Sequence, residues 1–257
     1  VDPKTNKVLD TIAGVKKPCG GFVSAFGTLW IGDCSQEKLV RIDTKEKKVK
    51  ASVDAIAIDS AQAIASSADS VWVISDAKTT LSRIDPDENK IVAEVRLPAG
   101  CNSVLFGEQA LWVTCPSLNA VLRLDPQTNL VANKIDVSGE PFATVAAEGA
   151  VWVFTRKEGK LLRIDPKTNK VAATIELKTP ELDASLAFGE GNIWVSSSGY
   201  PISRIEPTAE KEKVAQQFAG EAGGNVWFGS GSVWLSDAKT SSAVRFDPKR
   251  IKATLAE

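Results

Sequence analysis

Tryptophan recurs at a nearly fixed spacing along the chain. Six of the seven tryptophans are separated by 42, 40, 40, 42 and 40 residues. They are Trp30, Trp72, Trp112, Trp152, Trp194 and Trp234. A period of roughly forty residues is typical of repeat architectures, in which one supersecondary unit is copied along the chain. The sequence is therefore an array of copies of one supersecondary unit.

A second marker repeats in the same register. Ten or eleven residues after each of these tryptophans, an arginine precedes an apolar residue and then an acid. The arginines are Arg41, Arg83, Arg123, Arg163, Arg204 and Arg245. Six registered copies of two markers exclude chance similarity. We interpret the tryptophans as packing between units and the arginines as serving the same local structure in every unit.

Each unit contains four short runs rich in Val, Ile, Leu and Ala. In the fourth unit these runs cover residues 144–147, 151–154, 161–164 and 171–177. Runs of this length between Gly, Pro, Asn and Asp predict strands. The segment Asp165-Pro-Lys-Thr-Asn169 predicts a turn between the third and fourth strands. Pro fixes φ, the Asp carboxylate can accept backbone N–H bonds two residues on, and Asn tolerates the left-handed region.

Four antiparallel strands repeated at this period predict a β-propeller blade, since leucine-rich and ankyrin repeats are shorter and carry a helix. We predict an all-β chain, a single six-bladed β-propeller domain over residues 1–257. The predicted blades cover residues 21–53, 62–97, 102–137, 142–177, 184–218 and 224–255. Strands from both termini are expected to close the ring, with residues 1–12 as the outermost strand of the last blade. The opposite assignment, with residues 250–255 in that role, stays open.

The repeat resembles a known family. A Gly-containing turn is followed by Leu/Val-Trp-Val and then by Arg-Ile-Asp-Pro-x-Thr-Asn-Lys-Val. This pattern is similar to the YVTN-type propeller repeat and to the repeats of virginiamycin B lyase-like proteins, and it extends over essentially the whole sequence. The resemblance implies the propeller fold. For function, it implies a carbon–oxygen lyase that uses a histidine general base and Mg²⁺.

Four cysteines occupy related places in two units. Cys19 and Cys101 each precede a first strand, whereas Cys34 and Cys115 each follow a second strand. Because the start of one antiparallel strand lies beside the end of the next, we predict the disulfides Cys19–Cys34 and Cys101–Cys115. Such bridges favour a periplasmic, cell-surface or secreted protein. Zinc is the rival interpretation, but the spacing is wider than in structural zinc sites and the chain has no His.

The charge balance gives no support for nucleic-acid binding. The formal net charge is −1, and no block of Lys and Arg stands unopposed. No apolar run approaches transmembrane length and no signal peptide is visible. The chain starts in the middle of a repeat and contains no Met, so we expect a trimmed or matured product. We expect a monomer whose partner is a small molecule, a protein or a peptide.

The loops before the first strand and after the second strand vary between units. In a propeller these loops emerge on one face around the central channel, and we predict the ligand site there. Three aspartates at nearly equivalent places could bind Mg²⁺ or Ca²⁺ through carboxylate oxygens, the alternative being solvated loop acids or turn caps. These predicted cation ligands are Asp33, Asp76 and Asp237. The predicted ligand-orienting residues are Asn102, Arg156, Tyr200 and Asn225.

No motif identifies an enzyme. The lack of His excludes a Ser-His-Asp triad, a Cys-His pair and a histidine metal site. No glycine-rich phosphate or dinucleotide loop opens a helix. We therefore favour a ligand-binding or protein-interaction module that acts through the loop face. The alternative is a virginiamycin B lyase-like carbon–oxygen lyase or a lactone-acting enzyme, in which Glu140, Asp183 or a lysine of depressed pKa replaces the histidine base.

Overall fold

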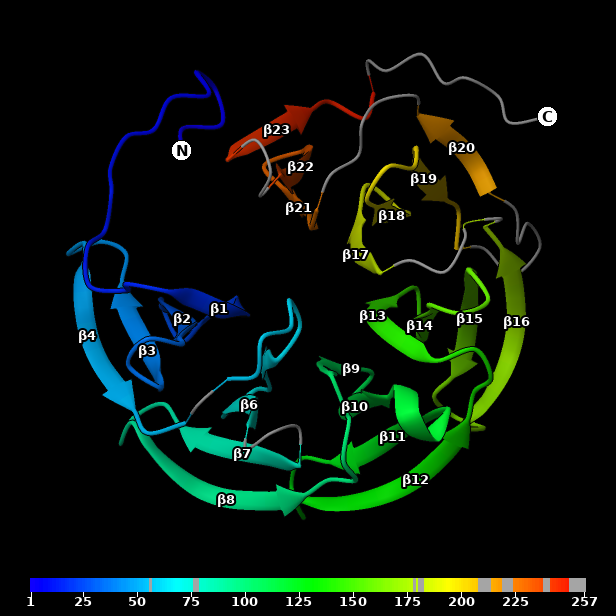
Figure 1. The fold of residues 1–257 in the computed structure, drawn as a ribbon, viewed down its shortest axis with the longest axis horizontal. Helices are drawn as coiled ribbons and strands as arrows, with labels where there is room; N and C mark the ends of the chain where they lie inside the picture. The colour runs from blue at the N-terminus through cyan, green and yellow to red at the C-terminus, as the bar shows by residue number, and fades with distance from the viewer. Residues whose placement is uncertain are drawn as a thin grey trace. The chain divides into compact units, whose positions relative to one another are not determined.

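The protein is nearly all β. The computed structural model describes residues 1–55, 57–75, 79–177, 179, 183–207, 214–218, 224–237 and 241–249. Within them it has five four-stranded sheets and one three-stranded sheet, in each of which neighbouring strands follow chain order (Figure 1). These sheets are the blades of the predicted propeller, and we number them one to six along the chain. They fall into two compact units, one with blades one and two and the other with blades four to six, while the residues of blade three are shared between them.

Blades one and two begin the chain's series of sheets. Blade one consists of β1 (Pro18–Ala25), β2 (Thr28–Asp33), β3 (Lys38–Asp43) and β4 (Lys48–Val53). Blade two consists of β5 (Ile64–Ser66), β6 (Val71–Ser75), β7 (Thr80–Asp85) and β8 (Lys90–Arg96). Blade three consists of β9 (Ser103–Gly107), β10 (Ala110–Cys115), β11 (Ala120–Asp125) and β12 (Leu130–Asp136), with the short 3-10 helix η2 (Pro116–Leu118) between β10 and β11.

The later blades repeat this arrangement. Blade four consists of β13 (Pro141–Ala147), β14 (Ala150–Thr155), β15 (Lys160–Asp165) and β16 (Lys170–Glu176). Blade five consists of β17 (Ala184–Gly189), β18 (Asn192–Ser197), β19 (Ile202–Ile205) and β20 (Val214–Phe218). The described part of blade six consists of β21 (Val226–Gly229), β22 (Ser232–Asp237) and β23 (Ser242–Phe246).

Five of the six register tryptophans are fully buried. Trp30, Trp72, Trp112, Trp152 and Trp194 are 0% exposed. Trp152 packs in one apolar cluster with Leu186 and Val195 of blade five. The ring of Trp194 meets the ring of Phe246 in blade six edge-on, with centroids 6.0 Å apart. The interpretation of these tryptophans as inter-blade packing is confirmed.

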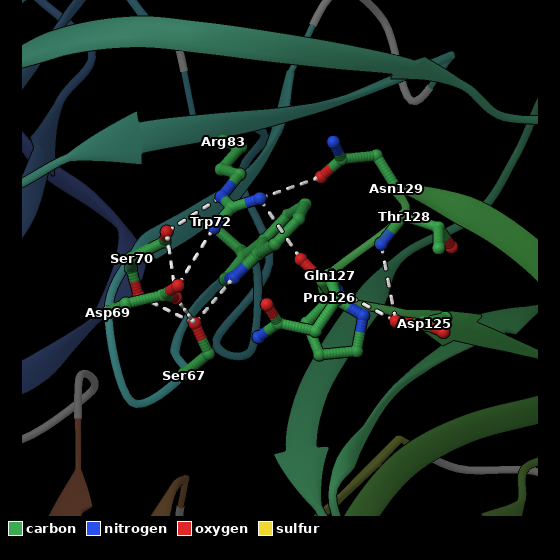
Figure 2. Close-up of polar contacts among 10 residues, drawn as sticks. All are labelled: Ser67, Asp69, Ser70, Trp72, Arg83, Asp125, Pro126, Gln127, Thr128 and Asn129. Carbon is green, nitrogen blue, oxygen red and sulfur yellow. Dashed lines mark hydrogen bonds and ion pairs between the residues drawn. The ribbon is translucent and has the colours of Figure 1, made fainter.

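The repeated arginine joins one blade to the next. Arg83 lies over the ring of Trp72, 5.4 Å from its centroid, and donates to Asp69 and Ser70 within its own blade. Its Nη1 also donates to the carbonyl oxygen of Pro126 at 3.0 Å and to Oδ1 of Asn129 at 3.2 Å, both in blade three (Figure 2). The arginine is therefore more than a local support within its own blade.

Two other repeated arginines make the same contacts with the next blade. Arg41 Nη1 donates to the carbonyl oxygen of Pro86 and to Asn89. Arg123 Nη1 donates to the carbonyl oxygen of Pro166 at 2.6 Å and to Oδ1 of Asn169 at 2.8 Å. We call this contact the arginine latch: a third-strand arginine bound to the Pro and Asn of the next blade's third turn.

The receiving turn has the predicted mechanism. Oδ1 of Asp125 accepts the backbone N–H of Gln127 at 2.7 Å and of Thr128 at 3.3 Å (Figure 2). Asn129 closes the turn with φ of 60°, the left-handed conformation that Asn tolerates better than other residues with side chains. The turn thus presents the Pro126 carbonyl and the Asn129 side chain as fixed acceptors.

The N-terminal prediction needs correction. Asp2 forms the expected turn, in which its carboxylate accepts the backbone N–H of Lys4 and the hydroxyl of Thr5. Residues 7–12, however, form no strand, and none of residues 1–17 lies in one. Val8 and Leu9 are each 70% exposed, and an ion pair between Asp10 and Lys47 ties the segment to blade one. A strand needs a neighbouring edge for its backbone hydrogen bonds, whereas this segment bonds within its own turn, where the N–H of Asn6 donates to the carbonyl oxygen of Asp2, and pairs Asp10 with Lys47. The rival closing strand, residues 250–255, lies outside the described residues.

Candidate functional site

The loops of blade four gather charged side chains at one end of the sheet. We call this end, formed by the loop before the first strand and the loop after the second, the loop end of a blade. The arginine latch lies at the opposite end of the blade, which we call the turn end, at the turn between the third and fourth strands. Glu140 precedes β13, Arg156 follows β14 and Asp183 precedes β17 of blade five. The three residues form an ion cluster, which we call the Arg156 cluster.

Glu140 holds the guanidinium of Arg156. Oε2 of Glu140 accepts Nε at 3.2 Å and Nη2 at 2.6 Å. On the other edge of the guanidinium, Nη1 of Arg156 lies 3.5 Å from Oδ1 of Asp183. The hydrogen bond to Glu140, followed by the charges of both acids, raises the pKa of Arg156 above its ordinary value. The arginine thus stays charged throughout any physiological pH range.

The backbone around Arg156 is also fixed. The N–H of Arg156 donates to the carbonyl oxygen of Glu140 at 3.0 Å, and the N–H of Lys157 donates to that of Gly139 at 2.9 Å. Glu140 itself has φ of 59°, an uncommon conformation for a glutamate, and its N–H donates to Oδ1 of Asn119 in blade three at 3.0 Å. Non-glycine residues held in this region are frequent at binding sites because the surrounding contacts must compensate for the strain.

An aromatic ring completes the cluster. The guanidinium carbon of Arg156 lies over the ring of Phe142, 5.7 Å from its centroid, a cation–π arrangement. Phe142 is the second residue of β13 and is half-buried. Sequence reasoning singled out Arg156 as a ligand residue, and Glu140 and Asp183 as candidate bases, but it missed Phe142. The repeat offered no signal for it, because the other blades carry no aromatic residue at the corresponding place.

Asp33, a predicted cation ligand, is bound by the protein itself. It ends β2 and is buried. Its carboxylate accepts the Ser35 hydroxyl at 2.7 Å and the backbone N–H groups of Lys16 at 2.9 Å, Lys17 at 3.2 Å and Ser35 at 2.9 Å. These donors, led by the Ser35 hydroxyl and the Lys16 N–H, hold the pKa of Asp33 well below its ordinary value. These four donors satisfy the buried carboxylate.

The side chains of the other two predicted cation ligands lie outside the described part of the chain. Asp76 lies outside the described residues, and of Asp237 only the backbone, the last residue of β22, is described. In the described portion of the chain, no group of three or more Asp, Glu or Cys side chains could hold a metal ion. The cation site stays a prediction.

The remaining predicted ligand residues lie in separate loops. Asn102 is buried directly before β9. Tyr200 follows β18, is half-buried, and donates its N–H to the carbonyl oxygen of Ser197 at 3.2 Å. Asn225 precedes β21, and its carbonyl oxygen accepts the N–H of Ser236 at 3.0 Å. Arg156, in contrast, is brought together with two other charged side chains, Glu140 and Asp183.

The cysteines are paired as predicted. Cys19 and Cys34 form a disulfide, with Cα atoms 5.9 Å apart, between the start of β1 and the residue after β2. Cys101 and Cys115 are also disulfide-bonded, and no cysteine is free. At Cys19 the strand carries a bulge, because register shifts between Cys19 and Phe22 and the two intervening glycines adopt φ of 76° and 74°.

Comparison with solved structures defines the class of fold. Virginiamycin B lyase from Staphylococcus aureus matches with a TM-score of 0.71 at 20% identity, over 87% of this chain and 77% of that chain. The catalytically inactive histidine-to-alanine variant of the same enzyme with quinupristin matches with a TM-score of 0.66 at 21% identity, over 87% and 78%. A β-propeller domain from Myceliophteria thermophila matches with a TM-score of 0.71 at 12% identity, over 94% and 89%. No protein-family model matches the chain, and neither does any curated protein sequence.

The fold is that of a six-bladed β-propeller. More particularly, it is similar to the propeller of virginiamycin B lyase, which confirms at the level of fold the resemblance seen in the repeat. In the residues that the structure describes, no helix is long and apolar enough to cross a membrane.

Proposed function

We propose that this β-propeller is an extracytoplasmic binding module that takes its ligand at the loop end of blade four, around the Arg156 cluster. The observation that carries the proposal is the contact of Arg156 with Glu140 of its own blade and Asp183 of blade five. A half-exposed arginine held on two sides can offer its remaining donors to a ligand at little entropic cost.

The two disulfides support an extracytoplasmic location. In reducing cytosol such bridges are rare, whereas they persist in periplasmic, cell-surface and secreted proteins. Each bridge also ties the start of a first strand to the end of a second strand, which stiffens the loop end of its blade.

An enzyme related in chemistry to virginiamycin B lyase is the second candidate, and the similarity of fold favours it. The comparison structure with quinupristin is a histidine-to-alanine variant described as catalytically inactive, and this chain has no His at all. Glu140 is a poor substitute for a histidine base, because its Oε2 already accepts two N–H groups of Arg156. A substrate proton transferred to that oxygen would compete with the two N–H groups of Arg156 for the same acceptor. Binding without turnover is therefore the better-supported function.

Ligand-observed saturation-transfer NMR tests this proposal. The panel contains quinupristin, succinate, glucuronate, galactose and a tripeptide, each measured with the parent protein, with R156Q and with R96Q. Arg96 is an exposed arginine at the end of β8 and serves as the matched control. We expect at least one compound to bind the parent and R96Q with a dissociation constant below about 1 mM and to lose about tenfold or more in affinity on R156Q.

Mass spectrometry of the same samples separates binding from chemistry. Every compound, quinupristin included, should be recovered intact after prolonged incubation with and without Mg²⁺. Binding that R156Q leaves unchanged, or no binding by any compound, would contradict the proposed site. Opening of the quinupristin ring would instead establish the lyase candidate.

A further inference from the structure

Glu140 uses only some of the N–H donors of Arg156. A guanidinium carries five N–H donors. Glu140 takes two of them, on Nε and Nη2, which leaves three, two of them on Nη1. The contact from Nη1 to Asp183 measures 3.5 Å, longer than the roughly 2.7–2.9 Å of a charge-assisted hydrogen bond. The Nη1 edge of the guanidinium therefore faces a carboxylate, that of Asp183, which it does not bind closely.

The two carboxylates differ in how firmly they are placed. Glu140 is anchored through its own N–H and carbonyl oxygen to Asn119 and Arg156, and its side chain is 28% exposed. The side chain of Asp183 is 64% exposed. Exposed ion pairs of this kind contribute little stability, because water competes for both charges. Asp183 is thus the replaceable partner of Arg156 and Glu140 the permanent one.

The geometry favours a ligand anion over a cation. Phe142 already has the guanidinium over its ring, so a ligand cation could not occupy that face without displacing Arg156. A ligand carboxylate, in contrast, would meet the N–H groups of Nη1, which Asp183 approaches only to 3.5 Å, and could bind one of them together with the remaining N–H of Nη2 in the fork arrangement that arginine forms with carboxylates.

We infer that the Arg156 cluster binds a ligand carboxylate, which replaces Asp183 at Nη1 of Arg156. Asp183 then acts as a built-in competitor that weakens binding and helps to select ligands able to displace it. This inference rests on the proposed function and adds the chemical class of the ligand. The carboxylate can belong to a small acid or to the C-terminus of a peptide, and both use the same contact.

Isothermal titration calorimetry with paired probes tests the inference. Succinate is compared with succinamide, and N-acetyl-trialanine with its C-terminal amide, so that each acid has a neutral partner of the same shape. The proteins are the parent, D183N, R156K and D136N. Asp136 is a matched control, because it is an exposed aspartate with its own ion pair, to Lys134 at 2.9 Å.

At least one acid should bind the parent, and D183N should bind that acid about tenfold more tightly, since a competing charge near the guanidinium has been removed. D136N should match the parent. R156K, which keeps the charge but loses the fork, should bind about tenfold more weakly. Binding of succinate alone would identify a small acid, and binding of the peptide acid alone would identify a peptide C-terminus.

Three outcomes would overturn the inference: D183N binds the acid no better than the parent, the neutral partners bind as well as the acids, or neither acid binds any of the folded proteins. If a compound without a carboxylate binds the parent and loses affinity on R156Q, the proposed function stands and only the carboxylate inference fails. Thermal unfolding of each variant confirms that it is folded before titration.

Discussion

Arg83 in β7 donates a hydrogen bond from Nη1 to the carbonyl oxygen of Pro126 at 3.0 Å, and thereby joins blade two to the turn between β11 and β12 of blade three (Figure 2). The bond spans 43 residues of sequence. A backbone carbonyl in a tight turn cannot move away without unfolding the turn, so the arginine has a fixed acceptor. This contact makes the stability of one blade dependent on the next.

Replacing Arg83 by alanine should therefore destabilise the protein. We expect a loss of about 2–4 kcal/mol in the free energy of unfolding, because hydrogen bonds from a charged donor are lost and their acceptors are left without it. R83K should recover only part of this loss, since a single ammonium cannot reach all the acceptors of a planar fork. Urea unfolding measures both variants. The exposed Arg96 gives the control, and R96A should change the free energy by less than about 0.5 kcal/mol.

Asn129 has two separable roles, as an acceptor for Arg83 at 3.2 Å and as a residue with φ of 60°. N129A should lose both, at a cost of about 2–3 kcal/mol, whereas N129G loses the acceptor but adopts the left-handed conformation freely. We expect N129G to be more stable than N129A by about 1 kcal/mol in urea unfolding. Equal stabilities would show that backbone strain plays no part at this turn.

The disulfide between Cys19 and Cys34 closes a loop with a sequence separation of 15 residues. Removing a crosslink of this length should cost about 3 kcal/mol, mainly because the unfolded chain gains freedom. The double variant C19A/C34A should therefore unfold at lower urea concentration than the parent, and reductant should lower its midpoint less than it lowers the parent's. Non-reducing peptide mapping of the parent should recover Cys19 with Cys34 and Cys101 with Cys115. Free thiols in protein from an oxidising compartment would refute the pairing.

Asp33 should make stability depend on acid pH. Its pKa is lower in the folded protein than the value of about 3.9 expected for an unfolded chain. The carboxylate therefore stabilises the fold fully above that unfolded value, and this stabilisation is lost as the pH falls toward the folded pKa. The parent should exceed D33N in free energy of unfolding at pH 7, and the gap should narrow below about pH 4. A gap between the parent and D33N that stays constant across this pH range would contradict the assignment.

The repeat was predictable from sequence because its markers do the same physical job in several blades. The indole of Trp152 and the guanidinium of Arg123 occupy repeated positions, so their period survives in the chain. The arginine latch itself was missed, although the similar offsets were a usable signal: 48 residues from Arg41 to Asn89, and 46 from Arg83 to Asn129 and from Arg123 to Asn169. The Cys19–Cys34 pairing followed from strand order alone.

The candidate site could not be read in the same way. Glu140, Arg156 and Asp183 come from three loops of two blades and share no period, so only the folded chain shows that they meet. The hydrogen-bond donors around Asp33 could not be read from the sequence either. Asp33 resembles Asp237 in its offset from tryptophan, but its surroundings supply four donors and make it a support for residues 16–17 and Ser35.

The arginine latch lies at the turn end of the blades, whereas Glu140, Arg156 and Asp183 lie at the loop end. The latch thus joins neighbouring blades at the end opposite to the proposed ligand site. Loop substitutions that spare the contacts of Glu140 with Asn119 and of Arg156 with Asp183 leave the latch in place. The turn end is therefore the constrained part of these blades, and the loop end offers a natural scaffold for grafting new recognition loops.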